Sequence, residues 1–500
     1  MSWKSWIAKP FARSVVARIY AQHERAVELQ QSILRELVRK GKTTAFGRDH
    51  RLASVNNHYE FTHAVPIRDY EALSSYFNRV VAGEENVLWP GLPLYLAKTS
   101  GTTSGAKYIP ITQASMPTHI KAARNALLAY IADSGNTDFI NGKMIFLQGS
   151  PVLEEKNGIK QGRLSGLVYH HVPGYLLKNR LPGYATNCIE DWDEKVLTIA
   201  RETMTKNMTL ISGIPPWVVM YFEKLLEESG KEKIKDLFPN FSLFVYGGVN
   251  YEPYRSKMET LIGRRIDSVE TYPASEGFIA YQDSQTEPGL LLNINAGMYF
   301  EFVPVSEFHD AQPGRLSLSE VQLDVNYVLI ISSTAGLWGY NIGDTIKFVS
   351  LKPYRIVVTG RVKHYISAFG EHVIGEEVEY AMQQAVKKSK ARVVEFTVAP
   401  QVNPEGAELP YHEWFVEFDE EPENIEAFAL ELDKQLQTKN VYYFDLIEGK
   451  VLQPLRLRVL QKGAFNDFMR SRGKLGGQNK VARLSNDRNI ADELKSFIIR

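Results

Sequence analysis

The chain has very little cysteine: among its 500 residues, Cys188 is the only one. A single cysteine cannot form an intrachain disulfide, and it excludes zinc sites that are built from several cysteines. The chain also lacks a basic excess, because 58 lysines and arginines are balanced by 58 aspartates and glutamates. Proteins that bind nucleic acids normally carry such an excess, so we expect no nucleic-acid partner.

Long hydrophobic runs are absent as well. No apolar stretch approaches the roughly 18 residues that a membrane-spanning helix needs, and the N-terminus lacks the apolar core of a secretion signal. With 44% hydrophobic and 23% charged residues, the composition is that of an ordinary globular protein. The sequence therefore predicts a cytoplasmic protein without a membrane span, which we expect to be a monomer.

Several common catalytic patterns are also missing. The G-x-S-x-G turn that exposes a nucleophilic serine does not occur, and Cys188 has no catalytic motif around it. The G-x-x-x-x-G-K-[ST] order of the Walker loop is absent too. His170 and His171 are adjacent, which on a strand would turn them to opposite faces, so we interpret them as structural or pocket-wall residues.

The segment from Lys98 to Lys107 is unusually rich in hydroxyl side chains and glycine. Gly101 and Gly105 permit positive φ, so that successive N–H groups can turn toward an anion, and Lys107 adds a point charge suited to phosphate. The hydroxyl donors are Thr99, Ser100, Thr102, Thr103 and Ser104. A polar surface turn is the simpler alternative, but five hydroxyls and two glycines in seven positions favour a phosphate-binding loop.

The length predicts two or three domains. Residues 12–40 have helical spacing, and Gly41 is placed to end that helix. Between about residues 92 and 350, short apolar runs alternate with helical ones, which is typical of a buried sheet with helices around it. We therefore expect a large multi-layer α/β domain over residues 1–360. After Arg361 the pattern changes to that of a smaller α+β domain, residues 361–500.

Glycine and acidic turns follow several of the predicted strands, where α/β sheets bind ligands. Gly247 and Gly248 end one strand, and a turn from Tyr272 to Gly277 follows another. A third turn runs from Tyr340 to Asp344, and the strand from Arg355 closes on Gly360 and Arg361.

These motifs resemble those of a known family. The loop Thr99–Lys107 resembles the phosphate-binding signature of the adenylate-forming superfamily. Its exact form, together with Tyr272-x-Ala274-Ser275-Glu276 and Tyr340-x-x-Gly-Asp344, is similar to the Gretchen Hagen 3 acyl acid amido synthetases, from about residue 40 through Lys480. The resemblance implies the fold of that superfamily, with ATP and Mg²⁺ as cofactors.

The resemblance also implies a role for each motif. It assigns Thr99–Lys107 to the β- and γ-phosphates of ATP, Gly247 and Gly248 to the adenine, Tyr272 to stacking on adenine, and Glu276 to Mg²⁺. Asp344 would accept the ribose hydroxyls, Arg361 would contact the ribose and α-phosphate, and Lys480 would neutralise the transition state of adenylation. In the plant members a Pro-Arg pair follows this lysine, whereas here Val481 is followed by Ala482 and Arg483.

The chemistry accounts for these residue types independently. A carboxylate that attacks the α-phosphorus builds up negative charge, which Mg²⁺, Arg361 and Lys480 can offset. The resulting mixed anhydride reacts with an amine without any protein nucleophile. Simpler alternatives exist: Glu276 and Asp344 could cap strand ends, Arg361 could form a surface ion pair, and Lys480 could be solvated in a basic loop.

The sequence thus predicts an ATP-dependent ligase that adenylates a small carboxylic acid and transfers the acyl group to an amino acid or another amine. A CoA ligase with the same first step and a catalytically silent binding protein are the alternatives. We expect an apolar and aromatic acid pocket formed by Tyr169, Val172, Leu176, Trp217 and Tyr221. The hinge between the domains is expected at residues 361–363, the only short link foreseen between them.

Overall fold

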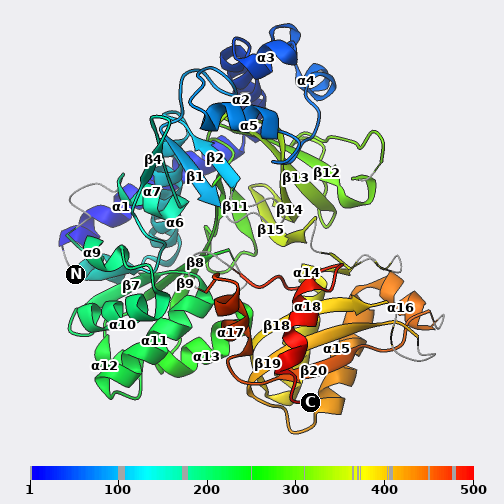
Figure 1. Cartoon of the computed structure of the whole chain (residues 1–500). Coiled ribbons are helices and arrows are strands. Elements are labelled where there is room, and N and C mark those ends of the chain that lie inside the picture. The colour runs from blue at the N-terminus through cyan, green and yellow to red at the C-terminus, as the bar shows by residue number, and fades with distance from the viewer. Residues whose placement is uncertain are drawn as a thin grey trace. The chain divides into compact units, whose positions relative to one another are not determined.

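Eleven strands form one mixed sheet in the computed structural model of the chain (Figure 1). The structure describes residues 3–99, 107–171, 178–248, 251–308, 310–362, 365–366, 368, 371, 373–402, 404, 409–448, 451–475 and 480–500. The strands are ordered β12-β13-β14-β15-β11-β10-β9-β8-β7-β3-β6. No helix within these ranges has the length and apolar character needed to cross a membrane.

One half of this sheet is parallel. Its strands are β3 (Lys143–Phe146), β6 (Arg180–Leu181), β7 (Met208–Ser212), β8 (Leu243–Gly247) and β9 (Asp267–Ala274). Helices α9 (Tyr184–Asn187), α10 (Trp192–Thr203), α11 (Pro215–Ser229), α12 (Ile234–Leu237) and α13 (Glu252–Ile262) connect them. Short apolar strands alternating with helices form parallel sheets, so the α/β class predicted from the sequence is confirmed.

The other half is antiparallel and runs through hairpins. It consists of β10 (Gly277–Tyr281), β11 (Leu290–Leu292), β12 (Met298–Pro304), β13 (Asn326–Ser333), β14 (Leu337–Leu351) and β15 (Tyr354–Arg361), with the 3-10 turn η3 (Val305–Glu307). The centre of its core is the fully buried Trp338, whose ring lies 5.7 Å from that of Phe46.

A separate four-stranded sheet has the order β2-β1-β5-β4. Its strands are β1 (Tyr95–Thr99), β2 (Lys107–Ile111), β4 (Glu154–Lys156) and β5 (Ile159–Gly162). Strands β1 and β2 form an antiparallel hairpin that closes on the pair Thr99 and Lys107. The two ends of the segment predicted to bind phosphate therefore lie side by side on paired strands.

The N-terminal region consists of helices and short turns. They are α1 (Trp3–His23), α2 (Ala26–Gly41), α3 (Ala45–Asp49), η1 (Leu52–Ser54), α4 (His58–Ala64), α5 (Ser74–Val81), α6 (Met116–Ser134), η2 (Asp138–Asn141) and α7 (Leu164–Tyr169). Helix α6 packs against the sheet residues Leu210, Leu243 and Val269, and α1 lies against α6 (Figure 1).

The single helix predicted over residues 12–40 is wrong, because the chain turns at Glu24 and Arg25 between α1 and α2. The glycine at position 41 is also required for a different reason from the helix termination that the sequence suggested. It is the last residue of α2, and a Cβ there would lie 2.3 Å from the ring of Trp338. The glycine is required by the close approach of this helix end to a buried tryptophan.

The C-terminal region is an α+β unit, as predicted. It comprises β16 (Tyr365–Ile366), β17 (Val373–Ile374), α14 (Gly375–Ser389), β18 (Arg392–Gln401), β19 (Tyr411–Glu420), α15 (Ile425–Lys439), α16 (Val441–Glu448), β20 (Arg456–Leu460), α17 (Ala464–Ser471), α18 (Asn489–Leu494) and η4 (Lys495–Phe497). Strands β18, β19 and β20 form one sheet, which packs around the buried Trp414. Helix α17 was not predicted.

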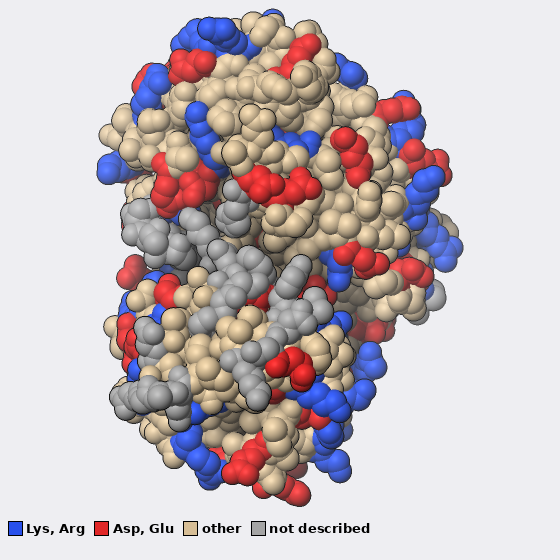
Figure 2. Space-filling view, turned by 90° about the vertical axis from the view of Figure 1, so that its right-hand side faces the viewer, with Lys and Arg blue, Asp and Glu red and all other residues tan. Residues whose placement is uncertain are grey.

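The chain divides into two compact units. The first unit is Met1–Val249 with Leu261–Val357, and the second is Asn250–Thr260 with Val358–Arg500. The second unit thus includes most of helix α13, and the chain passes between the units three times. The expectation of a single short link at Arg361–Lys363 is therefore wrong. Figure 2 shows side chains of both charge signs across the face that it presents, in agreement with the balanced composition.

Candidate active site

Of the predicted phosphate loop, the structure describes only the two end residues, Thr99 and Lys107. Ser100, Gly101, Thr102, Thr103, Ser104 and Gly105 lie outside the described residues. Thr99 is half-buried at the end of β1, and the Nζ of Lys107 at the start of β2 lies 3.4 Å from a carboxylate oxygen of Glu71. The ring of Tyr70 lies 5.3 Å from the same Nζ, and its hydroxyl accepts the N–H of Tyr108 at 3.0 Å. The lysine is thus held at the mouth of the hairpin by the segment around residue 70.

The two glycines at the end of β8 each have a steric reason. Gly247 pairs with Thr271 of β9, and a Cβ on it would lie 2.4 Å from the carbonyl oxygen of Thr271. Gly248 has a φ of +82°, which side-chain-bearing residues rarely adopt. Strand β8 therefore ends in backbone that carries no side chains, and a flat ring can approach it closely.

Glu276 lies at the tip of a tight hairpin. Ala274 of β9 pairs with Gly277 of β10, so Ser275 and Glu276 are its two turn residues. A Cβ on Gly277 would lie 2.2 Å from the Sδ of Met298, which accounts for the glycine. The predicted turn over Tyr272–Gly277 is too long, because Tyr272 and Ala274 belong to β9.

Asp344 lies in a bulge of strand β14. Val328 of β13 pairs with Thr345 and Ile330 pairs with Asn341, so three residues of β14 face one residue of β13. Gly343 within the bulge has a φ of +88°. The turn predicted at Tyr340–Asp344 is therefore a bulge within a long strand, which places a carboxylate where a regular strand would not.

Tyr272 and Asp344, which are 72 residues apart, meet in the first unit. The hydroxyl of Tyr272 donates a hydrogen bond to a carboxylate oxygen of Asp344, and both side chains are buried. The neighbouring motif residue Glu276 accepts a hydrogen bond from the hydroxyl of Tyr340 at 3.4 Å. Strands β9 and β14 thereby place two carboxylates, each oriented by a tyrosine, in one region.

Tyr340 is also surrounded by acidic groups. Burial raises the pKa of Tyr340 well above its ordinary value, and the charges of Glu276, Glu71 and Asp69 raise it further. The tyrosine therefore stays protonated and can donate. Sequence reasoning missed Asp69 and Glu71. The backbone of Arg68 forms a bridge to Tyr340 of β14, which brings both residues to this region. In the sequence, only the two carboxylates on either side of Tyr70 could have indicated them.

The carboxylates of the site could hold a metal ion only together with other ligands. Among the described residues, no three His, Cys, Asp or Glu side chains gather as a metal cluster. Mg²⁺ in nucleotide sites usually needs only one or two carboxylates, since phosphates and water supply the other ligands. Glu276 on its half-buried turn, with Glu71 and Asp69 near the same tyrosine, fits that limited requirement.

A buried cation lies on β6, the edge strand at the parallel end of the sheet, and the sequence did not indicate it. The guanidinium of Arg180 lies between the rings of Phe146 and Tyr169, at 4.8 and 4.3 Å from their centres. Its Nη2 donates to the side-chain oxygen of Gln148 at 2.5 Å, but its Nε and the Nε2 of Gln148 have no partner among the described residues. Burial lowers the pKa of Arg180 to about 10. An unused donor on a desolvated cation, with a second on the amide beside it, is suited to a carboxylate ligand.

The aromatic pocket predicted from the sequence is not supported by the residues that the structure describes. Trp217 and Tyr221 are core residues of α11, because Trp217 packs on Trp192 and the hydroxyl of Tyr221 bonds to Thr203 at 2.7 Å. Tyr169 packs on Arg180 instead of lining an apolar wall. Val172 and Leu176 lie outside the described residues.

The adjacent histidines also differ from the prediction. His170 and His171 follow helix α7 and do not belong to a strand. The Nε2 of His170 lies 2.9 Å from the carbonyl oxygen of Pro151, and that of His171 lies 3.0 Å from the hydroxyl of Tyr95. Both rings fix local structure, so the interpretation of these residues as structural is supported.

Arg361 and Lys480 belong to the second unit. Arg361 is the exposed last residue of β15, and Lys480 is exposed at the start of a segment that bridges to β18 through Leu484 and Val398. Lys363 and the residues 476–479 before Lys480 lie outside the described ranges.

Arg483 anchors the segment that carries Lys480. It forms ion pairs with Glu395 of β18 and Glu379 of α14, and its Nη2 donates to the hydroxyl of Tyr254 of α13 at 3.2 Å. Its guanidinium also lies over the ring of Phe396. A buried arginine with two carboxylates fixes this segment three residues after the lysine, so Arg483 is a positioning residue.

Comparisons with known proteins identify the family of the chain. Family models of the GH3 family match residues 15–183 (N-terminal domain), 291–361 (central domain) and 376–489 (C-terminal domain), more than two thirds of the chain together. A jasmonoyl–L-amino acid synthetase of Nicotiana attenuata, JAR4, is 21% identical over 89% of this chain and 88% of its own.

Two solved structures show the same fold. The AtGH3.15 acyl acid amido synthetase in complex with 2,4-DB has a TM-score of 0.78 at 17% identity and covers 96% of both chains. A 2-hydroxyisobutyryl-CoA ligase has a TM-score of 0.59 at 12% identity over 95% of this chain and 92% of its own. With its N-terminal, central and C-terminal domains matched in order, the chain belongs to the GH3 family.

Proposed function

We propose that the protein is an ATP-dependent ligase that joins a small carboxylic acid to an amino acid or another amine. The observation that carries the proposal is the meeting of Tyr272 with Asp344 beside the Glu276 turn. The printed names of the relatives support the amide product, since JAR4 is a jasmonoyl–L-amino acid synthetase. The silent binding protein is less favoured, because a fold kept only for binding has no need of these oriented carboxylates.

The first step would activate the acid. A carboxylate oxygen attacks the α-phosphorus of ATP, the bond to the β-phosphate oxygen breaks, and pyrophosphate leaves. Asp344 would accept the ribose hydroxyls while Tyr272 fixes its orientation, and Gly247 and Gly248 would admit the adenine. The loop between Thr99 and Lys107 would hold the β- and γ-phosphates with its hydroxyl and N–H donors.

Glu276 is proposed as the protein ligand of Mg²⁺. The ion, when bound, offsets charge on the phosphates. Tyr340 donates to one oxygen of Glu276 and thereby orients the carboxylate. Arg361 and Lys480 would neutralise charge at the α-phosphate, which requires the second unit to bring Lys480 to the nucleotide during this step. The hinge near 361–363 remains a proposal.

The second step would transfer the acyl group. The amine nitrogen attacks the acyl carbon, the bond to AMP breaks, and the amine loses a proton. No protein nucleophile is required because the mixed anhydride is already activated. We assign the carboxylate of the acceptor amino acid to Arg180 and Gln148, whose unused donors lie at the edge of the parallel sheet.

A pyrophosphate-release assay with a panel of carboxylic acids tests the proposal. We expect release that depends on the acid, ATP and Mg²⁺, followed by amide formation when amino acids are supplied. Preferential formation of a thioester with CoA would instead identify a CoA ligase. Absence of pyrophosphate release with every acid would leave a binding protein. The monomeric state and the cytoplasmic location also stay predictions.

A further inference from the structure

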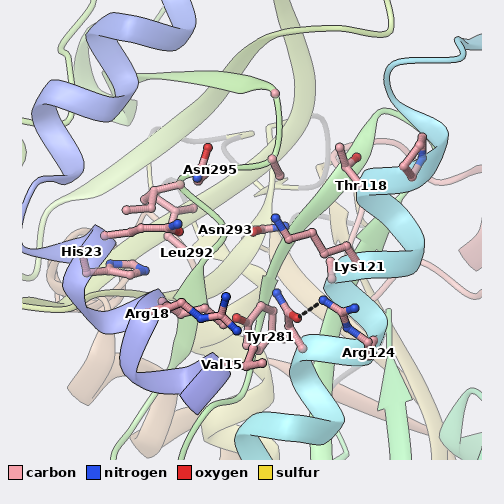
Figure 3. Close-up of a pocket in the computed structure, with 18 residues that line it drawn as sticks. Val15, Arg18, His23, Thr118, Lys121, Arg124, Tyr281, Leu292, Asn293 and Asn295 are labelled. Atoms are coloured by element: carbon pink, nitrogen blue, oxygen red, sulfur yellow. Dashed lines mark hydrogen bonds between the residues drawn. The ribbon is translucent and has the colours of Figure 1, made fainter. Parts of the chain in front are cut away.

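A cavity of about 270 Å³ lies in the first unit between α1, α6 and the chain that follows β11 (Figure 3). None of the residues assigned above to nucleotide or metal lines it. Helix α1 contributes one wall and helix α6 the opposite one, and residues 292–297 close the space between them. Its size is near the lower end of the range for small-molecule sites.

The lining is basic and contains no carboxylate. Arg18 of α1 and Lys121 and Arg124 of α6 contribute three cations, and none of the 18 lining residues, all within the described ranges, is Asp or Glu. None of the three cations forms an ion pair with a carboxylate of the described residues. Arg18 Nε donates to the carbonyl of Ser14, and Arg124 Nη2 donates to Asn125. In a chain with equal numbers of acidic and basic residues, this is a local excess of positive charge.

Exposed cations alone do not make a site, but His23 adds an independent observation. Its side chain lines the cavity and is only 7% exposed, and its Nδ1 has no hydrogen-bond partner among the described residues. Figure 3 shows the imidazole directed into the cavity from α1. Buried polar atoms normally have partners, so this nitrogen points to a missing one.

The protonation state of His23 determines which kind of group can form a hydrogen bond with its Nδ1. Burial lowers its pKa to about 4, and the nearby Asp283 is already paired with Arg355 and bonded by Tyr20. The ring is therefore neutral at pH 7. With the ring proton on Nε2, Nδ1 is an acceptor. The partner must supply a hydrogen, as a hydroxyl group does.

The amide residues of the wall add neutral hydrogen-bonding groups. Asn293 is fixed by two bonds to β10, from its Nδ2 to Phe278 and from its backbone N–H to Ile279. Figure 3 shows Lys121 extending from α6 toward Asn293 across the cavity. The buried Asn125, one helical turn after Lys121 on α6, also lines the cavity.

We propose that this cavity binds a small hydroxylated anion, a phosphate monoester or a carboxylate with a free hydroxyl group. Lys121, Arg124 and Arg18 bind the anionic group, and His23 Nδ1 accepts the hydroxyl hydrogen. The site is separate from the proposed ligase reaction and does not depend on it.

Isothermal titration calorimetry at fixed ionic strength, without ATP, tests the site. The probes are glycerol 3-phosphate and glycerate as the two hydroxylated anions, with inorganic phosphate and glycerol for comparison. We expect saturable binding of at least one hydroxylated anion, tighter than that of phosphate, and no binding of glycerol. Which of the two binds better distinguishes a phosphate ester from a carboxylate as the natural ligand.

Variants assign the binding to this cavity. Lys121→Gln with Arg124→Gln should weaken the affinity at least tenfold, whereas Arg13→Gln, an exposed cation of α1 outside the lining, should not. His23→Leu should remove the preference for the hydroxylated probe, and His23→Gln, which restores an acceptor, should keep part of it. Thermal melting checks that each variant is folded.

Three results would overturn the proposal: no saturable binding of either hydroxylated anion, an equal loss in Arg13→Gln, or an unchanged preference in His23→Leu. Because the titration involves no turnover, none of them would bear on the proposed ligase function.

Discussion

At the scale of single residues, the site is defined by carboxylates that tyrosines orient. Glu276→Gln keeps the size of the side chain and removes its charge, so the protein should lose the metal ligand and keep its fold. We expect pyrophosphate exchange to fall at least a hundredfold with an unchanged melting temperature. The exposed Glu155→Gln on β4 is the matched control. Near wild-type exchange in folded Glu276→Gln would remove this residue from the mechanism.

Substitution of Arg180 should impair recognition of the acceptor amino acid without impairing activation of the acid. Arg180→Met keeps the stem that packs between Phe146 and Tyr169 and removes the donors. The KM for the amino acid should rise by one to two orders of magnitude, since a hydrogen bond to a charged group is worth roughly 1.5–3 kcal/mol. Amide formation with hydroxylamine, which has no carboxylate, should change little. An equal loss with both amines would show that Arg180 has a structural role.

His23 makes the stability of the protein depend on pH. Its folded-state pKa of about 4 lies below the 6.5 of an unfolded histidine. Between these values the unfolded chain binds more protons, so the free energy of unfolding falls as the pH falls. The loss from pH 7.5 to 4 amounts to roughly 3 kcal/mol at 1.36 kcal/mol per unit. Urea denaturation should show that His23→Leu lacks this part of the pH dependence, while exposed His63→Leu is the control; an unchanged slope would contradict the prediction.

At the scale of elements, the sequence predicted those helices and strands whose formation depends on neighbouring residues in the chain. Short apolar runs such as Leu243–Tyr246 form buried strands, and the two ends of the glycine-rich loop lie on paired strands. The break between α1 and α2 carries no glycine or proline, so the sequence could not show it. The bulge at Asp344 and the bridge of Arg68 to Tyr340 depend on pairing between segments far apart in the chain. The residues next to them in the sequence do not indicate such pairing, so it could not be predicted.

Gly41 illustrates how an element can depend on a distant one. Gly41→Ala suits helix α2 by propensity, but the added methyl group would overlap the ring of Trp338. Overpacking of this kind costs about 1–3 kcal/mol, so the melting temperature should fall. Trp338→Phe in the Gly41→Ala background should recover part of the loss, although it removes the Trp338 bond to Leu88. A melting temperature equal to or above that of the wild type would show that α2 moves at no cost.

At the scale of the whole molecule, the two proposed half-reactions need different residues. Lys480→Ala should slow formation of acyl-AMP at least a hundredfold, because a positive charge at the α-phosphate is lost. Amide formation from supplied acyl-AMP should be nearly unchanged, because that step builds no charge on phosphorus. Lys462→Ala, which removes another exposed lysine of the second unit, should affect neither step. Equal losses of Lys480→Ala in both steps would contradict the assigned role.

The discontinuous second unit limits how this protein can be recombined with its relatives. Tyr254 bonds to Glu395 and Arg483, and Lys257 lies 3.9 Å from Asp419, so the stretch Asn250–Thr260 belongs with residues after Val358. A chimera joined at residue 361 would inherit a helix from one parent and its partners from the other. Exchange of the C-terminal region should therefore succeed only when α13 is transferred with it, as two coordinated crossovers.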